Sequence, residues 1–163
     1  PYIHADYLNE SQFYYTDKTN ELNEQNSYSW PITNGYTIER HFNVSSNQFF
    51  RFDPAKKPCK CRLVEIIVDD KKLNLANVTS NRIYNDGSYD YFLTSDSNYI
   101  VNSKINETVL IRYIVQPLTY VDMENIEAEK NKEMNELVLK YNTLYDKAHP
   151  VQTFNKKRHN KHK

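Results

Sequence analysis

Apolar and polar side chains alternate most clearly in residues 48–70, the stretch around which the rest of the chain is organised. Phe50 and Phe52 fall on one face of a predicted strand, and Arg51 and Asp53 fall on the other. Pro54 ends that strand, and Pro58 restarts the chain after a short turn. The strand that follows is apolar on both faces, which is typical of a central strand in a β-sandwich. One face carries Val64, Ile66 and Val68, and the other carries Leu63, Glu65 and Ile67.

Shorter alternating stretches on both sides predict further strands. They cover residues 12–16, 26–33, 36–44, 72–76, 89–94, 99–101 and 107–116. Pro31 indicates an edge strand or a bulge, and Asn34-Gly35 is the strongest hairpin signal in the chain. With the two central strands the set numbers eight or nine. It predicts a mainly β fold: a jelly-roll-like antiparallel β-sandwich followed by a C-terminal α-helix.

After Pro117 the apolar period changes from two to three or four, which predicts a helix over residues 122–148. The steps of three and four resemble a coiled-coil seam: Met134, Leu137, Tyr141, Leu144 and Ala148. Two interpretations stay open, a helix that packs on the sandwich edge and one that dimerises or leads into another domain. The predicted organisation is an opening segment (1–10), a sandwich (11–117), a helix or linker (118–150) and a disordered basic tail (151–163).

Charge and composition narrow the function classes. The chain has 21 basic and 21 acidic residues, and the tail holds five of the basic ones and no acid. The remaining body is mildly acidic, so we expect no nucleic-acid partner. There is no 18-residue apolar run and no signal peptide, and the first residue is Pro1, so we expect a piece of a larger cytoplasmic polypeptide. The basic tail allows a contact with the inner face of a membrane.

Cys59 and Cys61 lie two residues apart on one predicted strand, farther apart than a disulfide allows, and no histidine is close to them in the sequence. We therefore expect two free thiols and no zinc site. Only two glycines occur, so a phosphate-binding loop is excluded, and no nucleophile motif is present. We expect no enzyme, no cofactor and no metal site, with Asp86, Asp90 and Asp96 as the carboxylates that a calcium ion would use if one were bound.

A set of short motifs carries a resemblance. Phe13-Tyr14-Tyr15 is followed by Asn23-Glu24 with Ser27, then by Arg51-Phe52-Asp53-Pro54, and then by Pro58. In this order residues 11–115 resemble the β-sandwich accessory domain of bacterial glycosyltransferases that assemble O-antigen, capsule and rhamnan-type polysaccharides. The resemblance implies a noncatalytic module that holds or measures a glycan beside a transferase. The glycine-rich tip of the family's first loop is replaced here by residues 17–23, so the loop geometry does not carry over.

Sugar recognition needs flat aromatic faces and planar polar side chains. The residues that meet this need on predicted strands and loops are Trp30, Tyr36, Asn85, Asp86, Tyr89 and Tyr91. The opposing interpretation is that Trp30 belongs to the core and the tyrosines are half-buried sheet residues. Arg51 and Asp53 share a strand face and can pair, and Asp53 before Pro54 can also cap N–H groups of the turn. With Pro54 and Pro58 they are expected to be structural. Two partner classes remain: a glycan, and a second copy bound through Met134, Leu137, Tyr141 and Leu144.

Overall fold

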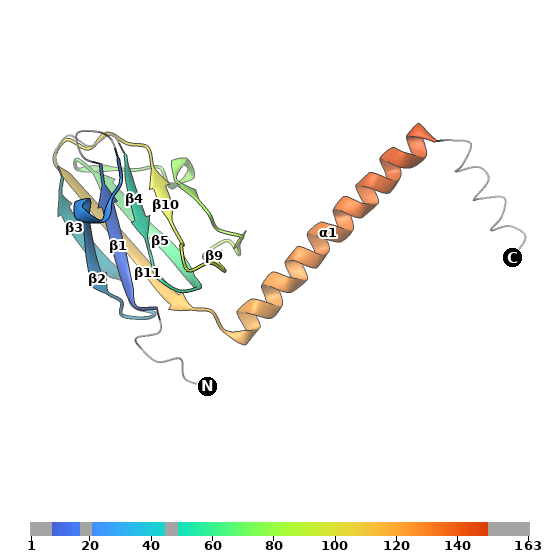
Figure 1. Ribbon diagram of the computed structural model, residues 1–163, viewed down its shortest axis with the longest axis horizontal. Helices are drawn as coiled ribbons and strands as arrows, with labels where there is room; N and C mark the ends of the chain where they lie inside the picture. The colour runs from blue at the N-terminus through green and yellow to red at the C-terminus, as the bar shows by residue number, and fades with distance from the viewer. Residues whose placement is uncertain (1–7, 17–20, 45–48, 150–163) are drawn as a thin grey trace, which may run out of the picture. The chain divides into compact units, whose positions relative to one another are not determined.

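Two antiparallel sheets face each other across an aromatic core (Figure 1). The computed structural model of the chain describes residues 8–16, 21–44 and 49–149. It divides into two units, one ending at Leu118 and the other beginning at Thr119. The predicted basic tail, residues 151–163, lies outside the described residues.

Among the described residues, the first sheet has five strands in the order β2-β1-β4-β10-β7. The second has six, in the order β3-β11-β5-β9-β8 with β6 beside β5. The first comprises β1 (Glu10–Tyr15), β2 (Ser27–Pro31), β4 (Phe50–Asp53), β7 (Thr79–Ser80) and β10 (Tyr99–Val101). The second comprises β3 (Ile38–Asn43), β5 (Cys59–Val68), β6 (Lys71–Lys72), β8 (Tyr84–Asn85), β9 (Asp90–Phe92) and β11 (Thr108–Pro117). Two 3₁₀ turns, η1 (Glu24–Asn26) and η2 (Leu75–Asn77), lie in the connections.

Neighbouring strands in each sheet are mostly far apart in the sequence, because the chain crosses repeatedly from one layer to the other, as it does in jelly rolls. The predicted jelly-roll-like sandwich with a C-terminal helix is therefore confirmed. Strands β9 and β11 match the predicted positions closely, and β10 matches residue for residue. One predicted strand is wrong in part. Residues 72–76 hold only the end of β6 and the start of η2, because the Asn74 side chain accepts from the Ala76 N–H and turns the chain.

The core is rich in aromatic rings because buried positions on most strands of the first sheet carry them. Phe52 on β4 is fully buried and contacts Trp30, Tyr99 and Tyr113, with ring centroids 6.2, 6.1 and 4.7 Å away. Phe13 on β1 is equally buried and joins the same cluster. These rings come from both sheets, so they hold the layers together.

A chain of hydrogen bonds crosses this core. The Trp30 Nε1–H donates to the Tyr113 hydroxyl at 2.7 Å, and the Tyr113 hydroxyl is 2.5 Å from the Ser11 Oγ. Ser11 in turn donates to the Pro54 carbonyl at 2.7 Å, so Tyr113 is the donor to Ser11. Burial raises the pKa of the Tyr113 phenol, which keeps its proton available to donate.

A bulge in β5 changes which side chains face inward. The pairing with β11 passes from Arg112 opposite Glu65 to Tyr113 opposite Leu63, so Val64 is the additional residue. Cys59 and Cys61 therefore face the core before the bulge, and Ile66 and Val68 do so after it. Val64 was predicted to share the face of Ile66 and is instead 36% exposed.

The Asn34-Gly35 turn does not close a hairpin, so that prediction is wrong. Strand β2 before it belongs to the first sheet and pairs with β1, whereas β3 after it pairs with β11 in the second. Gly35 has φ +77° and donates its N–H to the Val115 carbonyl of β11. The turn therefore carries the chain from one layer to the other.

A two-residue hairpin occurs instead at Asp69-Asp70, between β5 and β6. Both residues have positive φ, 49° and 62°. A type I′ turn requires such values at both of its central positions. The Asp69 carboxylate accepts from the N–H groups of Asn106, Glu107 and Thr108 at 2.8, 2.8 and 3.0 Å. These bonds lower the pKa of Asp69, and they tie this hairpin to the start of β11.

The lowered pKa of Asp69 predicts a loss of stability in acid. The contribution of a carboxylate whose pKa is lower in the folded state is present above its unfolded pKa, about 4, and disappears as the pH falls through the folded pKa. We expect Asp69→Asn to unfold at a lower urea concentration than the parent at pH 7, and the difference to shrink below about pH 4. Urea titrations at pH 7 and pH 3 measure this. Asp70→Asn, with the same left-handed backbone, is the control, and a difference that grows in acid would contradict the assignment.

Cys59 and Cys61 are free, as the sequence predicted, and the structure shows that both are buried. Burial raises the pKa of the Cys59 thiol to about 12 and that of Cys61 well above its ordinary value. Both side chains therefore behave as small apolar core residues.

Helix α1 (Tyr120–Ala148) is 29 residues long. It begins two residues earlier than the pattern predicted because Thr119 and Asp122 form a capping box. The Thr119 side chain accepts from the Asp122 N–H at 3.1 Å, and the Asp122 side chain accepts from the Thr119 N–H at 2.9 Å. The backbone N–H of His149 bonds to the Tyr145 carbonyl at the other end.

Candidate functional site

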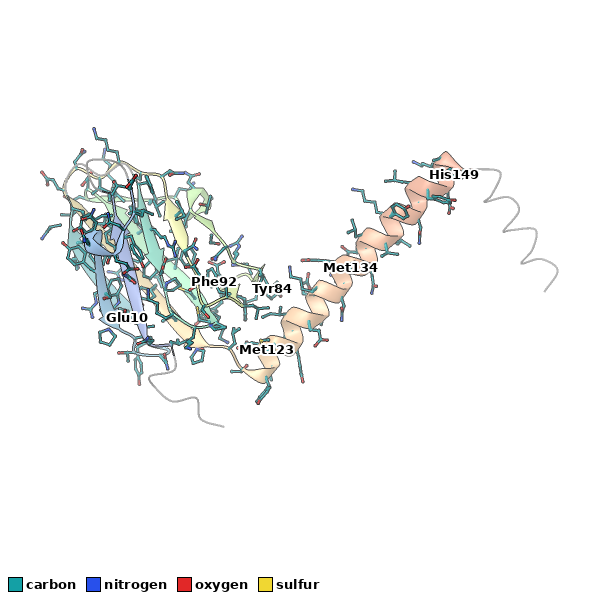
Figure 2. The ribbon with its side chains drawn as sticks, viewed as in Figure 1. Glu10, Tyr84, Phe92, Met123, Met134 and His149 are labelled. Atoms are coloured by element: carbon teal, nitrogen blue, oxygen red, sulfur yellow. The ribbon has the colours of Figure 1, made fainter. Side chains whose placement is uncertain are left out.

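A polar pocket opens where the edges of the two sheets meet. Strand β7 is the edge of the first sheet and β8 is the edge of the second, and both contribute to its wall. Figure 2 labels Tyr84 on β8 and Phe92 on β9, the two strands on the second sheet's side. The volume is about 180 Å³. It is smaller than the sites that enclose drug-sized ligands and suits one small polar group. Its lining residues are Leu63, Leu75, Val78, Ser80, Arg82, Asn85, Ser88, Asp90 and Tyr99.

Asp90 organises the polar wall of this pocket. Its Oδ1 accepts from Arg82 Nη1 at 2.6 Å and from Asn85 Nδ2 at 2.8 Å, and its Oδ2 accepts from the Tyr99 hydroxyl at 2.7 Å. Asp90 is buried, so these three donors compensate its charge. Burial, with Cys61 and Asp90 nearby, raises the pKa of Tyr99 and keeps its phenol protonated as a donor.

The turn between β8 and β9 shapes the mouth of the pocket. The Asp86 Oδ1 accepts from the N–H groups of Ser88 and Tyr89 at 2.8 and 2.7 Å, and its Oδ2 accepts from the Tyr91 hydroxyl at 2.8 Å. Burial alone would raise the pKa of Asp86, but these hydrogen bonds outweigh it and lower that pKa. Asn85 Oδ1 accepts from the Gly87 N–H at 2.8 Å, which fixes the amide that also bonds Asp90. The turn therefore holds Asn85 in place before any ligand arrives.

The pocket combines hydrogen-bond donors with apolar side chains. The Arg82 side chain is 51% exposed, so its guanidinium reaches both Asp90 and solvent. Ser80 and Ser88 add hydroxyl groups, and Leu75 and Val78 add apolar surface. A planar cation with fixed geometry, an amide and hydroxyls suit a ligand rich in oxygen acceptors. The apolar side chains suit the C–H face of the same ligand.

The six predicted ligand-binding residues do not gather at one place. Asn85 lines the pocket, and Asp86 and Tyr91 build the turn beside it. Tyr89 lies in that turn but outside the pocket lining, with Lys60 Nζ 5.5 Å from its ring centroid. Trp30 belongs to the core, bound to Tyr113, so its ring is not available to a ligand. Tyr36 is 70% exposed but precedes β3, at the opposite edge of the second sheet from β8.

The sequence did not identify Arg82 and Tyr99 as site residues, and it considered Asp90 only for calcium. A weak signal was present, because Arg82 and Asp90 flank the Asn85-Asp86-Gly87 turn. Tyr99 comes from the other sheet, and no pattern in the neighbouring sequence indicates that it reaches the pocket. Asp86, Asp90 and Asp96 bond Tyr91, Arg82 and Arg51, respectively. Within the described residues there is no group of three or more His, Cys, Asp or Glu that could hold a metal ion.

The predicted pair of Arg51 and Asp53 is present. Arg51 Nε and Nη2 donate to the two oxygens of Asp53 at 2.6 and 2.9 Å, and Nη2 also donates to Asp96 at 2.5 Å. Both Asp53 oxygens thus bond Arg51, in place of the turn N–H groups that the sequence suggested. Burial raises the pKa of Asp53 even though the guanidinium opposes it.

Glu24 in the first loop also bonds side chains of β1. Glu24 accepts from Gln12 at 2.8 Å and from Tyr14 at 2.9 Å. Pro54 accepts from Ser11, and Pro58 stands directly before β5. The motif residues Arg51, Asp53 and Pro54 thus form hydrogen bonds within the sandwich.

No family model, no curated protein and no solved structure matches the chain. Among the described residues, no helix is both long enough and apolar enough to cross a membrane. The features that bear on function are therefore the pocket, the exposed surfaces and the resemblance in the motifs.

Proposed function

We propose that the sandwich is a noncatalytic glycan-binding module and that one sugar unit occupies the pocket around Arg82, Asn85 and Asp90. The observation that carries the proposal is the arrangement of the donors. Asp90 holds the guanidinium and the amide through two hydrogen bonds, and apolar side chains line the same pocket. Fixed donors cost little conformational entropy on binding, which favours recognition of a weakly held, hydroxyl-rich ligand.

The resemblance supplies the setting for this proposal. A sandwich of this kind would serve a bacterial glycosyltransferase of cell-surface polysaccharide synthesis, as one part of a larger polypeptide in the cytoplasm, beside the inner face of the membrane. In that setting the module holds the polymer while another domain transfers the sugar. Its affinity for a single sugar is then expected to be weak, and the length of the polymer adds further contacts.

The Arg82 side chain provides the first test. A hydrogen bond to a charged group contributes about 1.5–3 kcal/mol, so we expect Arg82→Ala to weaken binding at least about tenfold. Isothermal titration with rhamnose, glucose, galactose, N-acetylglucosamine and glucuronic acid, and with oligosaccharides of the first, measures the affinity. Arg62→Ala is the matched control, because Arg62 is exposed on β5 and does not line the pocket. Equal binding by the two variants, or no heat with any sugar, would refute the proposal.

A second function is favoured by one feature of α1. Several large apolar side chains on this helix are exposed, among them Met134, Leu137, Tyr141 and Leu144. A helix with such a stripe commonly buries it against a partner. The chain is therefore also proposed to be an interaction module through α1.

A further inference from the structure

The apolar stripe on α1 occupies three of the seven heptad positions. If Met134 is placed at position a of a heptad, then Tyr141 also lies at a, Leu137 and Leu144 at d, and Val138 and Tyr145 at e. All six are at least 36% exposed. Position g carries charges instead, with Glu133, Lys140 and Lys147. One flank of the seam is thus apolar and the other is charged.

This asymmetry distinguishes two ways of pairing the helix with itself. In a parallel pair, position e of one helix lies against position g of the other. Val138 and Tyr145 would then lie against Glu133 and Lys140 of the second copy. In an antiparallel pair, each flank meets the same flank of the second copy, so e lies beside e and g beside g. The apolar flanks then cover each other.

One antiparallel register pairs all four residues at positions a and d with each other. In this register the two-fold axis of the pair passes at the height of residue 139. Met134 packs on Leu144 of the second copy, and Leu137 packs on Tyr141. Val138 meets Val138 on the apolar flank. On the charged flank Glu133 lies opposite Lys147 at both ends, and Lys140 meets its own copy at the centre, where its long stem can carry the ammonium outward.

We propose that α1 pairs with α1 of a second copy of this chain as a short antiparallel two-stranded coiled coil over residues 133–148. The partner is a second copy because Glu133 and Lys147, at the two ends of the charged flank, face each other when the helix pairs with itself in the antiparallel direction. In the single chain Glu133 pairs with Lys130 at 3.4 Å on the exposed helix. Such an exposed ion pair has little strength, and the new contact replaces it. The seam covers about two heptads, so we expect a weak dimer that forms only at higher protein concentrations.

This inference rests on the second proposed function, and its test separates the two. Sedimentation velocity of the full chain over a range of concentrations should show a monomer–dimer equilibrium. Leu137→Asp should abolish the dimer, and Leu139→Asp should not, because Leu139 is 70% exposed on the opposite side, at position f. A monomer at every concentration, or equal effects of the two variants, overturns the inference but not the wider proposal that α1 binds a partner. A trimer or tetramer overturns the two-stranded form alone.

Charge reversal tests the direction of the helices. Glu133→Lys alone places like charges at both ends of the antiparallel pair and should weaken the dimer at least severalfold. Adding Lys147→Glu should restore it, because opposite charges then face each other again. In a parallel pair these two positions do not meet, so failure of the second substitution to rescue the first overturns the antiparallel arrangement. In that case loss of the dimer in Leu137→Asp would leave the interaction function standing.

Discussion

Replacing Phe52 by alanine is expected to lower the free energy of unfolding by about 3–5 kcal/mol, a large part of the stability of a domain of this size. Phe52 is fully buried and its ring contacts Trp30, Tyr99 and Tyr113, which come from both sheets. Removing the ring leaves a cavity where the two layers meet, and the surrounding rings are too rigid to fill it. Urea denaturation followed by far-ultraviolet circular dichroism measures the change.

The matched control for Phe52 is another large aromatic residue outside the core. Tyr36 is 70% exposed. Tyr36→Ala should therefore change the unfolding free energy by less than about 0.5 kcal/mol. If the two alanine variants had similar stabilities, Phe52 would not be at the junction of the sheets. The comparison thus tests the sandwich itself, independently of any ligand.

Replacing Tyr113 by phenylalanine is expected to cost about 1–3 kcal/mol although it removes a single oxygen. That oxygen accepts from the Trp30 N–H and donates to Ser11, so its loss leaves a buried donor without an acceptor. A buried polar group without a partner destabilises the fold by more than the net contribution of the hydrogen bond that was lost. Thermal or urea unfolding of the variant gives the value.

Two further variants identify the source of that cost. Tyr36→Phe, which removes an exposed hydroxyl, should be close to neutral. Ser11→Ala and Tyr113→Phe should not add in the double variant, because both interrupt the same hydrogen-bond chain to Pro54. Full additivity would show that the two hydroxyls act separately and that the chain of bonds has no energetic coupling.

The fold class could be predicted from the sequence because the strand period is local information. Alternation in β11 and the change to a helical period after Pro117 depend only on neighbouring residues. The bulge at Val64 could not be read in this way, because an additional residue is defined only by the partner strand, here β11.

The turns show the same limit. Asn34-Gly35 has the residues of a tight hairpin and makes a tight turn, but the pairing of the strands around it is decided by the two sheets. Asp69-Asp70, a weaker signal, closes the hairpin of β5 and β6 because Asp69 is fixed by three backbone N–H groups at the distant start of β11.

Only the part of the candidate site at the Asn85-Asp86-Gly87 turn could be predicted from the sequence. Asn85 and Asp86 were found because their residue types mark the loop between β8 and β9. Arg82 and Tyr99 were not, since they meet Asp90 through the fold of the chain and not through spacing. For Trp30 the sequence left a ligand-binding and a core interpretation open, and its burial and its bond to Tyr113 decide for the core.

The most direct test of the proposed glycan site is a titration of the ¹⁵N-labelled chain with the same sugars, followed by amide chemical shifts. The site predicts shifts that saturate and that centre on Arg82, Asn85 and Ser88, and their loss in Arg82→Ala. Shifts that centre on the opposite edge of the second sheet near Tyr36, or no shift with any sugar at its solubility limit, would contradict it.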